Sequence, residues 1–166
     1  PLVVTQGDGN LGVKGKNFEM LFSIAGAGPA SLKVNGTEWL WRAPRPAFWR
    51  ASTDNDRGCG FPLRAAAWMA ADVFVTYNGM KVLEAGPDCV KVQFQFGIPT
   101  VSGASAELVY TVEAQGALRV DAVYHGVAGA PELPCFGVKF ETFGPVTRTV
   151  WTGLSGETYP DRYKGG

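Results

Sequence analysis

The sequence predicts an all-β protein built from antiparallel strands. Several segments alternate apolar and polar residues with a period of two, which is typical of strands that bury one face. The chain has 22 glycines and 11 prolines, and only 18% of its residues are charged, so turn signals outnumber helix-forming patterns. With 166 residues, of which 46% are hydrophobic, the chain can form a sizeable core, and we expect one domain over residues 1–166.

The first segments form a predicted meander. Large apolar residues on alternate positions predict a strand over 18–22, and the small residues of 25–29 end it. The dipeptide Asn35-Gly36 predicts a type I′ turn between strands at 31–34 and 37–40, because both central positions of that turn need positive φ.

The next part contains the one predicted helix. Pro44 and Pro46 are expected to end regular strand pairing, since proline cannot donate to a sheet ladder. The alanine-rich segment 63–71 predicts a short helix. Alternating residues over 73–77 then predict a strand, which the dipeptide Asn78-Gly79 ends with a turn.

The middle of the chain gives the clearest strand signals. Each of four segments alternates apolar and polar residues: 89–96, 106–112, 118–124 and 136–140. A turn at 114–116 separates the second segment from the third. Strands at such spacing, each with one apolar face, predict a large antiparallel sandwich.

Charge and cysteine content exclude several classes of partner. Lysine and arginine number 15, as do aspartate and glutamate, so a nucleic-acid or anionic-membrane partner has no electrostatic basis. Cys59, Cys89 and Cys135 make neither a disulfide framework nor a zinc pattern. Free thiols favour a cytoplasmic location, with the periplasm as the alternative. The chain starts with proline and carries no signal peptide, so we expect a processed protein or an excised piece.

Polar chemistry is concentrated in 48–58 and 156–163. The closely spaced oxygens of Asp54-Asn55-Asp56 suit a calcium ion, but Gly58 falls one place early for an EF-hand and Ala65 stands where that motif needs glutamate. The alternative is that Asp54 and Asn55 cap turns while Arg50 or Arg57 pairs with the carboxylates.

Catalytic constellations are not readable from the sequence. Paired carboxylates could act as acid and base in a glycosidase, but nothing places any two at the required separation; the candidates are Asp54, Asp56, Glu157 and Asp161. The single histidine, His125, is expected to face outward on a strand. Trp39, Trp41 and Trp49 precede the polar loop, where they would either stack on sugar rings or belong to a core or interface.

Two motifs carry a resemblance to a known family. Residues 48–58 (FWRASTDNDRG) and 151–162 (WTGLSGETYPDR) resemble the C-terminal, small-chain domain of bacterial β-galactosidases of glycoside hydrolase family 2. The resemblance covers nearly the whole chain. Ser52 stands where the family usually has proline, and Leu154-Ser155-Gly156 replaces the usual glycine-proline approach to the glutamate.

The resemblance implies a fold and a parent activity. The fold would be a β-supersandwich similar to galactose mutarotase, of which residues 1–166 form the N-terminal part. The parent enzyme would hydrolyse terminal β-D-galactosides with retention, using two glutamates on a TIM barrel outside these residues. Catalytic residues and cofactors are therefore expected to be absent here, with magnesium and sodium held mainly by other domains of the parent.

The resemblance also implies how the motifs are used. One set of residues would organise the loop presented to the active-site cleft: Trp49, Arg50, Asp54, Asn55, Asp56, Arg57 and Gly58. A second set would fix another loop on the same rim: Glu157, Tyr159, Asp161 and Arg162. The expected partners are other domains of the parent enzyme and its galactoside substrate. A sandwich without its later strands exposes an edge or an apolar face, so we also expect self-association.

Two other functions remain open at this point. An autonomous sugar-binding module would stack a glycan on Trp49 and Tyr159. A mutarotase-like enzyme would need a histidine and a carboxylate around the sugar ring, for which His125 is the sole histidine.

Overall fold

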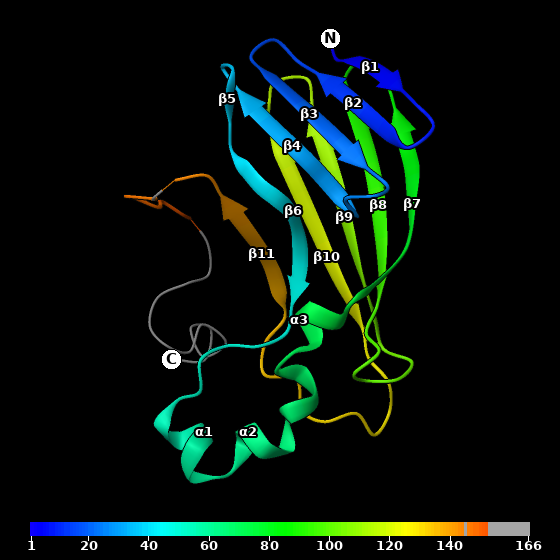
Figure 1. The fold of residues 1–166 in the computed structure, drawn as a ribbon. Helices are drawn as coiled ribbons and strands as arrows, with labels where there is room; N and C mark the ends of the chain where they lie inside the picture. Colours follow the sequence, from blue (N-terminus) through cyan, green and yellow to red (C-terminus); the bar gives the residue numbers. More distant parts are fainter. Residues whose placement is uncertain (145, 153–166) are drawn as a thin grey trace.

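The computed structural model describes residues 1–144 and 146–152, and it confirms an all-β, antiparallel sandwich (Figure 1). A five-stranded sheet runs in the order β1 (Val3–Gln6), β2 (Asn10–Lys14), β3 (Phe18–Ser23), β4 (Gly28–Val34) and β5 (Thr37–Glu38). A four-stranded sheet consists of β10 (Leu118–His125), β9 (Ser105–Glu113), β8 (Cys89–Gly97) and β7 (Thr76–Ala85). A third sheet pairs β6 (Leu40–Ala47) with β11 (Gly137–Thr142).

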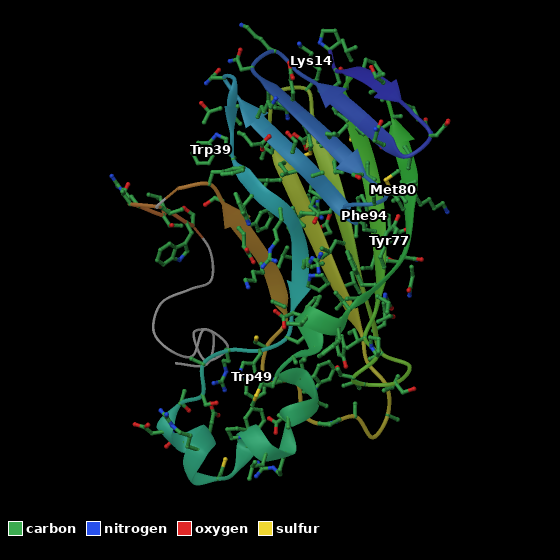
Figure 2. All side chains as sticks on the ribbon, viewed as in Figure 1. Lys14, Trp39, Trp49, Tyr77, Met80 and Phe94 are labelled. Carbon is green, nitrogen blue, oxygen red and sulfur yellow. The ribbon has the colours of Figure 1, made fainter. Side chains whose placement is uncertain are left out.

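The main core lies between the five-stranded and four-stranded sheets, which face each other in Figure 1. The strands expected at 18–22, 89–96, 106–112 and 118–124 are confirmed, and their alternating apolar residues face inward as predicted, apart from the exposed Ala122. Phe22 bridges the two sheets, with ring centroids 6.2 Å from Phe94 and 5.8 Å from Tyr110. Figure 2 shows Phe94 beside Tyr77 and Met80 of β7.

The turn between β4 and β5 is confirmed at Asn35-Gly36, where φ is 50° and 79°. Glu38 then fixes the junction with β6, because its Oε1 accepts hydrogen bonds from the amides of Leu32, Trp39 and Leu40 at 2.9, 3.1 and 3.1 Å. Burial raises the pKa of this carboxyl, but the bonds from the Ser31 hydroxyl and the three amides outweigh it and leave the pKa below its ordinary value. The start of β6 is thus held in place.

The prediction that Pro44 and Pro46 end strand pairing is wrong. Both lie inside β6, where Pro46 pairs with Val138 of β11. The register shifts between Lys139 and Glu141, where β6 has one extra residue, and Pro44 falls within this bulge. Proline is tolerated there because β6 pairs with one neighbour and a bulge needs no ladder donor.

The predicted helix at 63–71 is broken into short pieces, α2 (Phe61–Arg64), a 3₁₀ turn over Ala66–Trp68 and α3 (Ala71–Phe74). The buried residues of this segment are Phe61, Ala65, Trp68 and Ala71. From Ala65 to Ala71 these buried residues are spaced three apart, which suits a 3₁₀ turn better than a continuous α-helix.

The strand predicted at 73–77 is also wrong, because 71–74 is helical and β7 begins at Thr76. The Asn78-Gly79 turn does not form. The two residues lie at a register shift inside β7, where the partner β8 continues without interruption.

No helix in residues 1–144 and 146–152 is long and apolar enough to cross a membrane.

Candidate functional site

The first motif lies where β6 leaves the sandwich and enters the helical segment. Phe48 follows β6 directly and is fully buried, Trp49 is half-buried, and Arg50 is exposed. Figure 2 shows Trp49 beside the helices, at the opposite end of β6 from Trp39. The polar residues that follow are therefore presented at the end of the molecule that carries α1 (Asp54–Gly58).

A second core anchors this end. The Phe48 ring lies 5.6 Å from Trp68 and 5.8 Å from Phe136, and Tyr124 at the end of β10 lies 5.7 Å from Trp68. Trp68 donates from its indole Nε1 to the carbonyl of Pro131 at 3.1 Å, so its polar atom is satisfied. Four aromatic side chains from separate parts of the chain thus hold the base of the motif.

The start of α1 is fixed by a capping box formed by Thr53 and Asp56. The amide of Asp56 donates to Thr53 Oγ1 at 3.2 Å, and the amide of Thr53 donates to Asp56 Oδ2 at 2.8 Å. Each residue therefore satisfies a backbone donor of the other. Ser52 is half-buried just before this cap.

Arg50 binds the capping carboxylate from outside the helix. Its Nη1 and Nη2 lie 2.5 and 3.2 Å from Oδ2 and Oδ1 of Asp56, and Nη1 also donates to the carbonyl of Ala51 at 3.1 Å. These bonds from Arg50 are the main reason that the pKa of Asp56 lies far below its ordinary range, and the Thr53 amide adds to the effect. The Asp56 side chain is 15% exposed, so the pair is shielded on one side.

The other polar residues of the motif lie further out. Arg57 Nη2 pairs with Asp54 Oδ1 at 3.0 Å, and both side chains face solvent. Asn55 is exposed as well. Gly58 ends α1 without a positive φ, and a Cβ there would meet nothing within 4 Å, so the local geometry does not require glycine at this position. Glycine is favoured instead at Gly60, whose φ of 68° begins α2.

The geometry favours arginine pairing over a calcium site. Asp54 and Asp56 pair with different arginines. The N-cap of the helix is Thr53, and its partner in the capping box is Asp56 rather than Asp54 or Asn55. Within residues 1–144 and 146–152, no group of three or more histidine, cysteine, aspartate and glutamate side chains could hold a metal ion. Sequence reasoning missed Thr53, although threonine three places before an acidic residue is the signal for a capping box.

The remaining expected residues are placed as follows. His125 is exposed at the end of β10. Trp39 and Trp41 are exposed beside the start of β6. Cys59, Cys89 and Cys135 are free thiols, the first exposed and the others half-buried. The second set of rim residues, Glu157, Tyr159, Asp161 and Arg162, lies outside the described residues.

Comparison with known proteins agrees with the two motifs. A family model described as beta galactosidase small chain matches residues 14–166. A β-galactosidase small subunit of Latilactobacillus sakei is 44% identical over 184 residues, which cover 99% of this chain and 58% of that subunit. β-Galactosidases of Clostridium acetobutylicum and Streptococcus thermophilus are 35% and 36% identical, and the chain spans 18% and 16% of their length. The chain therefore belongs to the β-galactosidase small-chain family.

Proposed function

We propose that this chain is a non-catalytic segment of a β-galactosidase and that its helix α1 helps to close the active-site cleft of the assembled enzyme. The relatives support the assignment to a β-galactosidase, because they are a small subunit and longer β-galactosidases of which the chain matches a part. The parent would hydrolyse terminal β-D-galactosides with retention, through glutamates on a large subunit or on other domains. Those domains and the galactoside are the proposed partners.

The observation that carries the proposal is the pair Arg50–Asp56. A carboxylate that completes a capping box and accepts two hydrogen bonds from one arginine holds the loop between them in one conformation. The pair joins α1 to the residues that follow β6. It therefore fixes the positions at which Asp54, Asn55 and Arg57 face solvent. A rigid polar turn of this kind can complete one side of a substrate cleft.

Cofactors and location follow the same proposal. Magnesium and sodium would be bound by other parts of the parent enzyme, since the carboxylates of the first motif pair with arginines. The three free thiols fit a reducing compartment, so we propose a cytoplasmic enzyme, with the periplasm as the alternative.

A chimera tests the proposal. Residues 1–166 would replace the matched segment of the L. sakei small subunit, and the chimera would be co-expressed with a large subunit. Co-purification reports assembly, and hydrolysis of o-nitrophenyl β-D-galactoside reports activity. We expect an assembled, active complex in which Arg50→Ala lowers kcat/KM by about tenfold or more, because a displaced loop misplaces the substrate.

Arg119→Ala is the matched control, since it also removes an exposed arginine that pairs with a carboxylate, Asp121, but on β10 rather than in the first motif. An assembled chimera whose kcat/KM is unchanged by Arg50→Ala would contradict the role at the cleft. A chimera that folds but does not bind the large subunit would contradict the assignment as a small-chain segment.

A second function has one observation in its favour. Trp39, which is 50% exposed, lines a groove of about 260 Å³ with Thr37, Thr142 and Arg148, and an aromatic face beside hydroxyl groups suits a sugar ring. An autonomous carbohydrate-binding module would therefore bind galactosides through this groove rather than through the half-buried Trp49. Calorimetric titration of the chain with galactose and lactose tests this, and flat titrations would exclude it.

A further inference from the structure

Two adjoining grooves lie on the outer face of the five-stranded sheet. The lysine groove, of about 430 Å³, is bordered by the turns that join β2 to β3 and β4 to β5. The Gly12 groove, of about 360 Å³, runs over β1 to β4. Lys14, Glu19 and Lys33 line both grooves, so a ligand can extend from one into the other. Figure 2 shows Lys14 at the end of the molecule opposite Trp49, so the grooves are separate from the first motif.

The lysine groove carries an excess of positive charge. Lys14, Lys16 and Lys33 line it, and Glu19 is its one carboxylate among the described residues. Lys14 Nζ lies 2.7 Å from Glu19 Oε1, and this bond is the main reason that the pKa of Glu19 is below its ordinary value. Within residues 1–144 and 146–152, no ion pair joins Lys16 or Lys33 to a carboxylate. Two positive charges are therefore left for an anionic ligand.

The backbone that carries these lysines is rigid. The amide of Asn35 donates to the carbonyl of Asn17 at 2.8 Å, which joins the two turns, and the amide of Gly15 donates to the carbonyl of Phe18 at 2.9 Å. A Cβ at Gly15 would overlap the Phe18 ring, which packs against the main core. The turns are thus held in one conformation before a ligand binds, which lowers the entropy cost of binding.

The Gly12 groove suits an uncharged sugar ring. Gly12 faces outward, because its neighbours in β2 are buried, and its register partners are Thr5 of β1 and Leu21 of β3. Since glycine has no side chain, the sheet surface is open at this position. Thr5 and Ser31 contribute hydroxyl groups to the lining, and Leu21 contributes an apolar surface. Hydroxyls beside an apolar surface match the polar edge and the C–H face of a sugar.

We propose that the two grooves together bind a phosphorylated sugar, with the phosphate group between Lys16 and Lys33 and the sugar ring over Gly12. A phosphate monoester carries about two negative charges at pH 7, which matches the two positive charges in excess. The chain has a formal net charge of zero, so it does not offer the extended basic surface that a nucleic acid requires. The proposal does not depend on the cleft function given above.

Titrations followed by amide ¹H–¹⁵N correlation spectra test this site in the full chain. The probes are galactose 6-phosphate, inorganic phosphate and galactose. We expect galactose 6-phosphate to shift the amide signals of residues 14–17 and 33–36, and to bind about threefold or more tightly than inorganic phosphate, because the ring adds contacts in the Gly12 groove. Galactose without phosphate should leave the signals of residues 14–17 unshifted.

A lysine variant tests the phosphate end of the site. Lys33→Gln removes one of the two unpaired charges, and we expect the dissociation constant for galactose 6-phosphate to rise about tenfold. Lys81→Gln is the matched control, because Lys81 is also exposed but lies on β7 of the other sheet, and it should leave the constant unchanged. Circular dichroism would establish that each variant is folded.

A glycine variant tests the sugar end separately. A Cβ at Gly12 would come no closer than 3.7 Å to its nearest neighbour, the carbonyl oxygen of Thr5, and valine favours strands, so Gly12→Val should fold. Its side chain would occupy the Gly12 groove. We expect the affinity for galactose 6-phosphate to fall to that for inorganic phosphate, and the affinity for inorganic phosphate to stay unchanged.

Three results would overturn the proposal. The first is that galactose 6-phosphate leaves the signals of residues 14–17 and 33–36 unshifted. The second is that folded Lys33→Gln and Lys81→Gln weaken binding equally. The third is that the unmodified chain binds galactose 6-phosphate and inorganic phosphate with equal affinity, which would mean that the lysines hold an adventitious ion only.

Discussion

The guanidinium of Arg50 and the carboxylate of Asp56 meet at two points, 2.5 and 3.2 Å apart, across the turn that begins α1. The same carboxylate accepts a hydrogen bond from the amide of Thr53 at 2.8 Å, so one side chain both completes the capping box and serves as the anion for the arginine. This relationship connects the end of β6 to the exposed polar face of α1, and it makes the geometry of the motif sensitive to a single charge.

The first prediction concerns the pH dependence of stability. The pKa of Asp56 is lowered in the folded chain, chiefly by Arg50, while an unfolded aspartate titrates near pH ~3.9. The unfolded state therefore binds a proton first, and the stabilisation is present above about pH 4 and is lost as the pH falls further. Urea unfolding at about pH 3 and about pH 7 should show a smaller pH dependence for Asp56→Asn than for the wild type.

The control for this prediction is Asp54→Asn. The Asp54 side chain is fully exposed and pairs with Arg57 on the surface, where an ion pair contributes little. This variant should keep most of the wild-type pH dependence. If Asp56→Asn keeps it too, the Arg50–Asp56 pair does not form in solution.

The second prediction concerns the N-cap. Thr53→Ala removes the hydroxyl that accepts from the Asp56 amide, and it should lower the local opening free energy of α1 by about 1 kcal/mol. Thr53→Ser keeps an acceptor and should retain most of that free energy. Hydrogen exchange at the Asp56 amide measures both variants, and equal exchange rates in Thr53→Ala and Thr53→Ser would argue against the cap.

The third prediction concerns the second core. Phe48→Ala leaves a cavity among Trp68, Tyr124 and Phe136, so the free energy of unfolding should fall by about 3–5 kcal/mol. Limited proteolysis within residues 50–58 should become faster, because the base of the motif loses its anchor. Leu63→Ala, at a highly exposed position of α2, should change stability by no more than about 0.5 kcal/mol. Equal losses in both variants would contradict the placement of Phe48.

The fourth prediction concerns Tyr110 in the main core. Its ring is fully buried, its hydroxyl has no hydrogen-bond partner among the described residues, and burial raises its pKa. Removing an unsatisfied buried hydroxyl removes a desolvation cost, so Tyr110→Phe should raise the free energy of unfolding by about 1 kcal/mol. The free energy of unfolding of Tyr124→Phe, which removes a hydroxyl at the second core, is measured for comparison. A loss of stability in Tyr110→Phe would show that the hydroxyl is hydrogen-bonded in solution.

Long strands with a period of two were predictable from the sequence. The segments 89–96, 106–112 and 118–124 form strands because their apolar residues fall on every second position and share one buried face. The Asn35-Gly36 turn was predictable for a local reason as well, since its positive φ values suit these two residues. The two polar motifs were sufficient to indicate the family, which the comparisons confirm.

Other elements depended on contacts between distant residues. Pro44 and Pro46 stay within a strand because β11, about 90 residues later, pairs with β6 around a bulge. The alanine-rich segment 63–71 breaks into short turns because Trp68 must reach Phe48 and the carbonyl of Pro131. Local propensity cannot include such contacts, and tertiary packing overrides it.

The sequence by itself determined the fold class, the family and the cluster of charges in the first motif, because these follow from periodicity and from residue types at fixed spacing. The tertiary structure decided which arginine binds which carboxylate, since Arg50 and Arg57 are both near Asp54 and Asp56 along the chain. It also decided that Phe140 of β11 is exposed while Val138 of the same strand packs against the main core, because burial depends on which distant strands cover a side chain.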